Sequence, residues 1–317
     1  MKKTALYFLL LLLTSTIGLF VLANKDSNST KAITLAPISA TPLVSKPLTP
    51  LKVLYVTHDE SSKHHDYVGQ HQVFESIATE QGWDYSILAP KSKGLIQTLE
   101  ENTDFAKGYD VVVYNFCVAG SKNLKAVANV INQTKKLHVD ALLIHGSMHS
   151  FFPTYSKRLY ERLDEEALKN LDLVSVGIGE GVADAKLVKK WENANPNEEF
   201  PIWGDFCGAA SEKHARHLPV KIHKLRDHES AKSVIQDYTI SKSELYLNLY
   251  KTDNLIEILE GTTVETNPEK EVSATVLWER PYEKASVMGL SLGHFLDEWK
   301  TPEFQALLVH SIEYLAN

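Results

Sequence analysis

Short apolar runs that end in polar loops alternate with amphipathic stretches over the first half of the folded part of the chain. Runs of this kind are typical of strands buried on both faces of a parallel sheet. They lie at 51–57, 83–89, 109–115 and 139–145. Helices are predicted between them, at 71–81, within 94–108 and at 124–133. The alternation predicts right-handed βαβ crossovers and a mostly parallel sheet with helices on both faces.

The second half has shorter apolar runs, followed by one amphipathic helix. The strand-like runs lie at 220–223, 255–260, 274–278 and 286–292. Pro302 to Leu315 predicts a closing helix, because its apolar residues recur on one face. The stretch 192–208, rich in Asn, Pro, Trp and Gly, predicts a loop over the sheet. One continuous domain over 51–317 is the simplest interpretation.

The N-terminal segment has the pattern of a secretion signal. Residues 1–23 combine two lysines, an uncharged apolar run and a cleavage site ending at Ala23. A segment of this length is alternatively retained as a single membrane anchor. Residues 24–50 are rich in Ser, Thr and Pro, which predicts a tether. We therefore expect an exported protein, either periplasmic or anchored facing the exterior, that meets a membrane only through this segment.

Composition and charge exclude several classes of protein. A hydrophobic content of 44% and a charged content of 23% are ordinary for a globular chain. The net charge of −7 excludes a nucleic acid held by bulk charge. Two cysteines exclude a disulfide scaffold and a four-cysteine zinc module. Cys117 and Cys207 either pair in an oxidising compartment or, as the simpler reading, stay buried thiols.

Histidines follow the predicted strands. In an open α/β sheet, ligands bind outside the carboxyl ends of the strands. The residues at these ends are His58-Asp59-Glu60, 115–120, His145-Gly-Ser-Met-His149, Asp227-His228-Glu229 and Gly293-His294. Four of these five segments contain a histidine, from a total of 13 in the chain. The pattern predicts a histidine-rich site at this edge of the sheet.

Individual residues can be given candidate roles. His145 and His294 each follow an apolar run and adjoin a glycine, and an imidazole moves protons near neutral pH. Glu244 is the candidate carboxylate that orients a histidine or polarises water. Candidate substrate-binding residues are Asp59, His65, Asn115, His228 and Trp299, the last as a platform for a sugar ring. Alternatively, His145 and His294 bind a metal such as zinc together with His228 or a loop histidine.

Several motifs in order give the chain a family resemblance. The firmest are Gly289-Leu-Ser-Leu-Gly-His294, then Trp299, Pro302 and Phe304, and the end of the final helix at Ile312-Glu-Tyr-Leu-Ala316. Supporting motifs are 52–57, Tyr109-Asp-Val-Val-Val, Leu143-Ile-His145, Asp227-His228 and Glu244-Leu-Tyr246. Over 52–316 the sequence resembles the trehalose-utilisation (ThuA-like) family. The resemblance implies a flavodoxin-like three-layer α/β sandwich with a mostly parallel sheet, of the class I glutamine amidotransferase-like type.

The resemblance also bears on the chemistry. An amidotransferase of this fold carries a nucleophilic cysteine in the tight turn after a central strand, whereas this chain has His145 there, so we do not expect a glutaminase. The family implies a small carbohydrate, a disaccharide or an oxidised sugar, as the partner. His145 and His294 would then be an acid/base pair in an isomerase, lyase or hydrolase, covered by the 58–66 loop.

Two other functions stay open at this point. One is a metal-dependent hydrolase in which histidines bind the ion, and the other is a sugar-binding module without catalysis. The sequence makes no cofactor certain, and it gives no oligomeric state.

Overall fold

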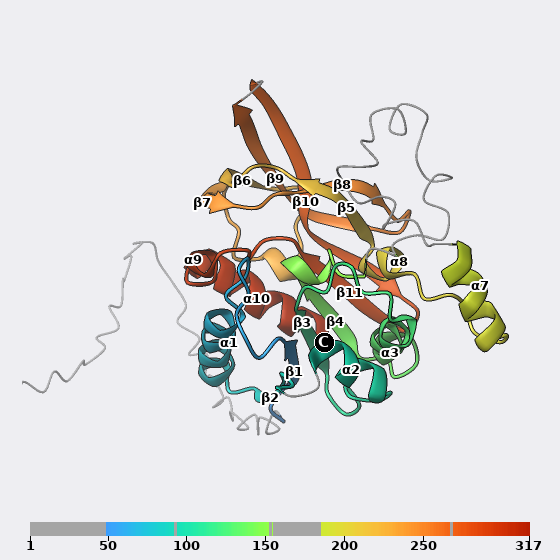
Figure 1. The fold of residues 1–317 in the computed structure, drawn as a ribbon. Helices are drawn as coiled ribbons and strands as arrows, with labels where there is room; N and C mark the ends of the chain where they lie inside the picture. Colours follow the sequence, from blue (N-terminus) through green and yellow to red (C-terminus); the bar gives the residue numbers. More distant parts are fainter. Residues whose placement is uncertain (1–48, 92–93, 152–153, 155–184, 267–268) are drawn as a thin grey trace, which may run out of the picture. The chain divides into compact units, whose positions relative to one another are not determined.

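The computed structural model describes residues 49–91, 94–151, 154, 185–266 and 269–317 (Figure 1). The predicted signal segment and nearly all of the predicted tether lie outside these residues. Thr49 to Asn317 form one compact unit. No helix within the described ranges is both long and apolar enough to cross a membrane.

A nine-stranded sheet forms the centre of the unit, in the order β2-β1-β3-β4-β11-β10-β9-β6-β7. Its strands are β1 (Lys52–Thr57), β2 (Asp84–Leu88), β3 (Val111–Asn115), β4 (Asp140–Ile144), β6 (Leu218–Lys224), β7 (Tyr238–Ser243), β9 (Ile256–Thr266), β10 (Glu269–Tyr282) and β11 (Ala285–Leu290). The strands from β2 to β11 in this order are parallel. From β10 to β7 the sheet continues with antiparallel pairs. The predicted flavodoxin-like α/β fold is confirmed, and the antiparallel extension is an addition to it.

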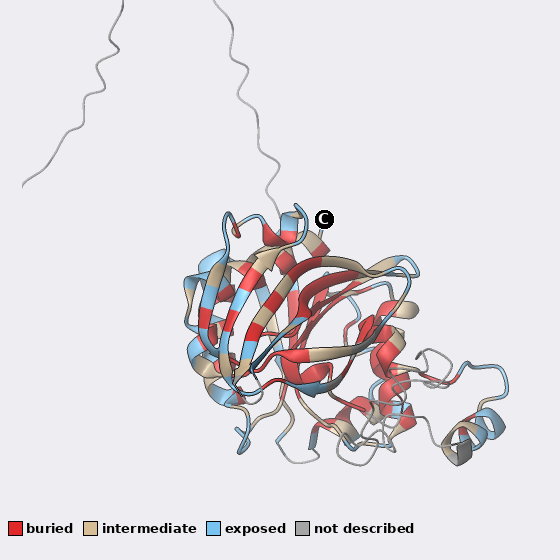
Figure 2. Cartoon of the chain, turned by 90° about the horizontal axis from the view of Figure 1, so that it is seen from above, coloured by how far each residue is buried: buried red, intermediate tan, exposed pale blue. Residues whose placement is uncertain are grey.

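Helices cover both faces of the parallel strands (Figure 1). The described helices are α1 (Tyr67–Gln81), α2 (Gly94–Glu101), α3 (Leu124–Lys135), α7 (Ala185–Ala194), α8 (Trp203–Cys207), α9 (Leu296–Trp299) and α10 (Pro302–Leu315), of which α7 stands away from the sheet (Figure 1). Val53 and Tyr55 of β1 share a core with α1 and α10, whereas Leu54 and Val56 share a second core with α2 and α3. This alternation follows from the two-residue period of a strand. Figure 2 shows the buried residues running along the strands.

The predicted elements agree with the structure best where the apolar pattern is strongest. The closing helix α10 has the predicted bounds, because the Thr301 hydroxyl caps its first turn by accepting from the Phe304 amide. Helix α1 begins at Tyr67 rather than 71, because the Asp66 carboxylate accepts from the Gly69 amide at 3.0 Å. The predicted loop 192–208 includes the short helix α8.

Three strands were not predicted, and all of them lie at edges. They are β7 and the two strands of a separate small sheet, β5 (Ala209–His214) and β8 (Tyr246–Lys251). The sequences of β5 and β7 mix polar and apolar residues, as is usual for strands exposed at an edge. Local apolar runs therefore gave no signal for β5 and β7.

Strand direction decides which residues reach the functional edge of the sheet. β9, β6 and β7 pair antiparallel in turn, so β7 runs with the parallel strands and β6 runs against them. The residue after β7, Glu244, therefore lies at the same edge as the ends of β4 and β11. The residues after β6, including His228, emerge at the opposite edge.

Candidate functional site

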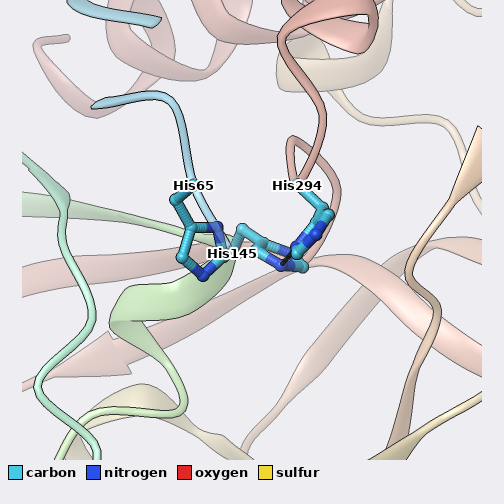
Figure 3. A group of neighbouring side chains, drawn as sticks. All are labelled: His65, His145 and His294. Atoms are coloured by element: carbon cyan, nitrogen blue, oxygen red, sulfur yellow. Dashed lines mark hydrogen bonds between the residues drawn. The ribbon is translucent and has the colours of Figure 1, made fainter. Parts of the chain in front are cut away.

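Side chains from four separate segments meet at the carboxyl edge of the parallel strands. His145 follows β4, His294 follows β11, Glu244 follows β7, and His65 lies in the loop between β1 and α1. Figure 3 shows the three histidine rings turned toward one another. Their centroids are 4.7 to 5.4 Å apart, and one ring nitrogen of each lies within 4.8 Å of the others. The structure thus brings the predicted catalytic residues His145, His294 and Glu244 together.

A tight turn places His145 at the centre of this group. The residue has φ of 39° at the start of a short 3-10 turn, which is uncommon for a residue with a Cβ and costs roughly 1–3 kcal/mol. Gly146 follows, and a Cβ there would lie 3.0 Å from Cβ of Cys117. A side chain there would push the neighbouring segment away, so glycine favours the close approach of this turn. The strain at His145 is consistent with a functional position.

Both nitrogens of the His145 ring are engaged. Nδ1 lies 2.7 Å from the carbonyl oxygen of Ser291, to which it donates. Nε2 lies 3.0 Å from Oε2 of Glu244, 3.0 Å from Nδ1 of His294 and 2.9 Å from the hydroxyl of Tyr246. Because a carbonyl only accepts, the contact with Ser291 fixes the proton of a neutral ring on Nδ1. Nε2 then presents its lone pair to the cluster.

Glu244 is the hub of the cluster. Its Oε2 contacts His145 and, at 3.1 Å, Nδ1 of His294. Its Oε1 lies 2.9 Å from Nε2 of His217 and 3.3 Å from Nε2 of His214. Although burial opposes ionisation, the hydrogen bonds and charges of His145 and His294 outweigh it and hold the pKa of Glu244 well below its ordinary value. The carboxylate is therefore charged throughout the physiological pH range.

His65 approaches the cluster from the loop that was predicted to cover it. Its ring is half-buried, and burial together with the charges of His145 and His294 lowers its pKa to about 3. The ring is thus neutral near pH 7 and keeps one lone pair for an ion or for a hydrogen bond from a substrate hydroxyl. Asp59 lies half-exposed at the start of the same loop.

Two further rings line the cluster beside His145. The Tyr246 ring stacks on His145, with centroids 4.3 Å apart, and on His149, with centroids 3.7 Å apart and planes within 3°. Burial lowers the pKa of His149 to about 3, so its ring is neutral. This stack holds the Tyr246 hydroxyl against Nε2 of His145.

Three predicted substrate-binding residues have other positions. His228 lies at the opposite edge, where Nε2 is 3.3 Å from Glu279, so it does not join His145 and His294 as predicted; the alternative, a loop histidine, is the one beside them, as His65. Trp299 is 0% exposed, and its indole N–H donates to the carbonyl of Gly293. It is a core residue and offers no face to a sugar. Asn115 is buried and donates to Gln70, which in turn donates to the carbonyls of Gly293 and His294. Asn115 therefore positions Gln70, which in turn holds the backbone at His294.

Sequence reasoning missed His214 and His217, and it left His149 and Tyr246 without a role. The available signal was the spacing of His214 and His217, three positions apart, together with Tyr246 two positions after Glu244. It also missed Glu298, a buried carboxylate that accepts from the amides on either side of His294.

The cysteines are free thiols, as the simpler reading predicted. Cys207 is buried in the core. Cys117 lies beside Gly146, so a thiol is closer to the cluster than the sequence indicated. Burial raises the pKa of the Cys117 thiol, and the Glu244 carboxylate raises it further. The group is therefore protonated and a poor nucleophile at neutral pH.

Comparisons with known proteins support the fold. No family model matches the chain, and no curated protein matches its sequence. A solved structure described as ThuA-like, from Bacteroides uniformis, has a TM-score of 0.55 at 13% identity and covers 86% of this chain and 94% of its own. Another ThuA-like structure, from Parabacteroides merdae, has a TM-score of 0.56 at 14% identity, covering 85% and 91%. The resemblance stated from the sequence is thus confirmed at the level of the fold.

Proposed function

We propose that the protein is a metal-dependent enzyme acting on a carbohydrate, and that His145, His294, Glu244 and His65 bind one divalent ion. The observation that carries the proposal is a triangle of three potential ligand atoms. His145 Nε2, His294 Nδ1 and Glu244 Oε2 are 3.0, 3.0 and 3.1 Å from one another. They converge at the edge of the sheet where this type of fold binds its ligands.

Lone pairs that face one another in this triangle favour a positive charge at its centre. With Nδ1 of His145 donating to Ser291, a neutral His145 ring has only a lone pair on Nε2. The Glu244 carboxylate also has only lone pairs, so the hydrogen bond from Nε2 to Oε2 that lowers the pKa of Glu244 forms only when the ring carries a second proton. A positive charge there, as a metal ion or an extra proton, would remove the repulsion.

The surroundings fit an ion of the zinc type. Imidazole and carboxylate suit zinc and similar transition metals. A metal-binding histidine usually donates its other ring N–H to a carbonyl or carboxylate, as His145 does to Ser291. Zinc–ligand bonds of about 2.0–2.2 Å in a tetrahedral site separate neighbouring ligand atoms by roughly 3.3–3.6 Å. The triangle needs only a slight expansion to reach that size.

When bound, such an ion would polarise a substrate oxygen and lower the pKa of water. The residues of the chain would supply the hydrogen-bond donors and acceptors around the substrate. Tyr246 places its hydroxyl 2.9 Å from His145 Nε2, where it can donate to a substrate oxygen. His65, neutral near pH 7, can offer its lone pair to the ion or accept a hydrogen bond from a substrate hydroxyl, from the side of the loop. The sugar substrate is proposed from the family resemblance and from the ThuA-like structures of similar fold, and export from residues 1–23.

Elemental analysis of the full chain, purified without chelator or affinity metal, tests the proposal. We expect at least about one equivalent of a divalent transition metal, and loss of one equivalent in a His145→Ala, His294→Ala double variant. His228→Ala is the matched control, because His228 is also a largely buried histidine beside a glutamate. A folded protein that binds no added zinc would contradict the proposal.

One observation favours a second candidate, acid/base catalysis without a metal. The 3.0 Å separation of His145 Nε2 and His294 Nδ1 is that of a hydrogen bond, so the two rings can share a proton. In that case turnover of a disaccharide or keto-sugar would persist in excess chelator and disappear in His145→Ala. Sugar binding without turnover, unaffected by His145→Ala, would instead support a binding module.

A further inference from the structure

A second group of potential ligands shares Glu244 with the first. His214 ends β5, and His217 lies in the connection to β6. Their Nε2 atoms are 3.3 and 2.9 Å from Oε1 of Glu244, the oxygen that faces away from His145. One ligand atom from each of the three residues lies within 4.8 Å of the others. Each oxygen of one carboxylate therefore faces its own set of histidines.

The proton of His214 is fixed in the same way as that of His145. Nδ1 of His214 donates to the carbonyl of Ala215 at 2.8 Å. A neutral His214 ring therefore turns its Nε2 lone pair toward the lone pairs of Glu244 Oε1. The His214 and His217 rings are also stacked, with centroids 5.6 Å apart and planes at 21°, which brings both nitrogens to one side of the carboxylate.

The arrangement of these rings suits two ions. Four imidazoles, those of His145, His294, His214 and His217, surround a single carboxylate, two at each of its oxygens. A divalent ion on each oxygen would bind all four nitrogens.

The group formed by His214, His217 and Glu244, the outer group, is also accessible to solvent. The side chains of His214 and His217 are 46% and 39% exposed, whereas that of Glu244 is 9% exposed. An ion bound there could keep water in its remaining positions, which is the open arrangement of a catalytic rather than a structural site.

We propose that His214, His217 and Glu244 bind a second divalent transition metal, so that Glu244 bridges two ions, one through each oxygen. The proposal deepens the function proposed above and rests on it for the first ion, the inner one, at His145 and His294. Two-metal sites hold their ions about 3.5–4 Å apart and clamp a substrate from both sides. A bridging carboxylate whose two oxygens face separate histidine groups is the arrangement that such a pair requires.

Metal titration of the full chain tests the proposal. Protein stripped with chelator is titrated with Zn²⁺ by calorimetry, and bound metal is counted by elemental analysis after removal of the excess. We expect two equivalents for the unmodified chain and one for the double variant His214→Ala, His217→Ala. His223→Ala is the matched control, because His223 is a partly exposed histidine paired with Asp237, the residue just before the neighbouring strand β7. It should retain both equivalents.

Loading with Mn²⁺ gives a second readout. Two bridged ions couple magnetically, so the paramagnetic resonance spectrum should show exchange coupling that disappears in the His214→Ala, His217→Ala variant. Both substituted side chains are partly exposed, so the variant should fold, and circular dichroism checks this.

The outcomes separate this proposal from the function on which it rests. One equivalent that is lost in His145→Ala, His294→Ala but kept in His214→Ala, His217→Ala would overturn the second site and leave the proposed function standing. One equivalent that is lost in His214→Ala, His217→Ala but kept in His145→Ala, His294→Ala would support an ion at His214 and His217 and contradict the ion at His145 and His294. No bound metal in the unmodified chain would overturn both.

Discussion

The Glu298 carboxylate accepts a hydrogen bond from the Ser243 hydroxyl at 2.9 Å. The same carboxylate accepts from the amides of Gly293 at 3.0 Å and Phe295 at 3.1 Å. Ser243 directly precedes Glu244, and the two amides flank His294. One buried side chain of α9 therefore fixes the backbone on which two members of the cluster are mounted, although it touches neither of them.

Replacing Glu298 should loosen the cluster without removing a ligand. In Glu298→Gln, an amide group must face one of the three donors, which we expect to cost about 1–3 kcal/mol of unfolding free energy. Zinc affinity should fall by roughly 10–100-fold, as is usual when the support of a ligand is lost. Calorimetric titration measures the affinity, and chemical denaturation in chelator measures the stability. Glu303→Gln, an exposed position in α10, should change neither.

The charge of Glu244 should matter more than its shape. Glu244→Gln keeps the size of the side chain and one carbonyl oxygen but removes the negative charge that both groups of histidines share. We expect zinc affinity to fall by at least about 100-fold, with a smaller loss in Glu279→Gln, a buried carboxylate at the opposite edge. Equal zinc affinities for Glu244→Gln and the unmodified chain would argue that no ion contacts this residue.

Gly293 should tolerate no side chain. It has φ of 101°, and a Cβ would lie 2.8 Å from the Phe304 ring and 3.1 Å from the indole nitrogen of Trp299. Gly293→Ala combines backbone strain with overpacking, so we expect a loss of about 2–4 kcal/mol of unfolding free energy. Denaturant titration measures this loss. Gly120→Ala is the control, because a Cβ there meets nothing within 4 Å, and its effect should stay within about 0.5 kcal/mol.

Stability should depend on pH through Asp140, at the start of β4. Burial and the nearby charge of Glu279 raise the pKa of Asp140 from 3.8 to about 6, although the Ser286 amide donates to the carboxylate. The folded chain therefore holds this proton more tightly than the unfolded chain does. The resulting stabilisation is complete below about pH 4 and is lost as the pH rises through 6.

The expected loss from this group is about 1–2 kcal/mol, because partial exposure to solvent reduces the effect of the shift. Asp140→Asn keeps an oxygen for the Ser286 amide and cannot ionise. The difference in unfolding free energy between the two proteins should therefore change between pH 4 and pH 6, and a constant difference would refute the assignment. Comparing the two cancels the titration of the histidines, which both contain.

The sequence predicted the parts of the site that depend on local pattern. His145 and His294 follow apolar runs that form parallel strands, so their position at the strand ends could be inferred. His228 follows a run that looks the same locally, but β6 runs in the opposite direction. Direction is set by long-range pairing, which no short segment encodes.

Two other features of the site depend on tertiary contacts. Trp299 is a core residue because its N–H reaches the carbonyl of Gly293, and a sequence does not distinguish this from an exposed ring. His214 and His217 belong to an edge strand and its connection, whose polar sequence hid both the strand and its position beside Glu244. The three-residue spacing of these histidines is visible in the sequence, but their contact with Glu244 is not.

The residues of the cluster are distant in sequence. His145 is 99 positions from Glu244 and 149 from His294. An unfolded chain does not hold these groups together, so an ion bound to all of them acts as a removable cross-link that exists only in the folded state. Such a ligand adds about 2.7 kcal/mol to stability when its free concentration is 100 times the dissociation constant. In surroundings rich in the ion, the folded chain should therefore outlast proteolysis, and where the ion is scarce its lifetime should shorten.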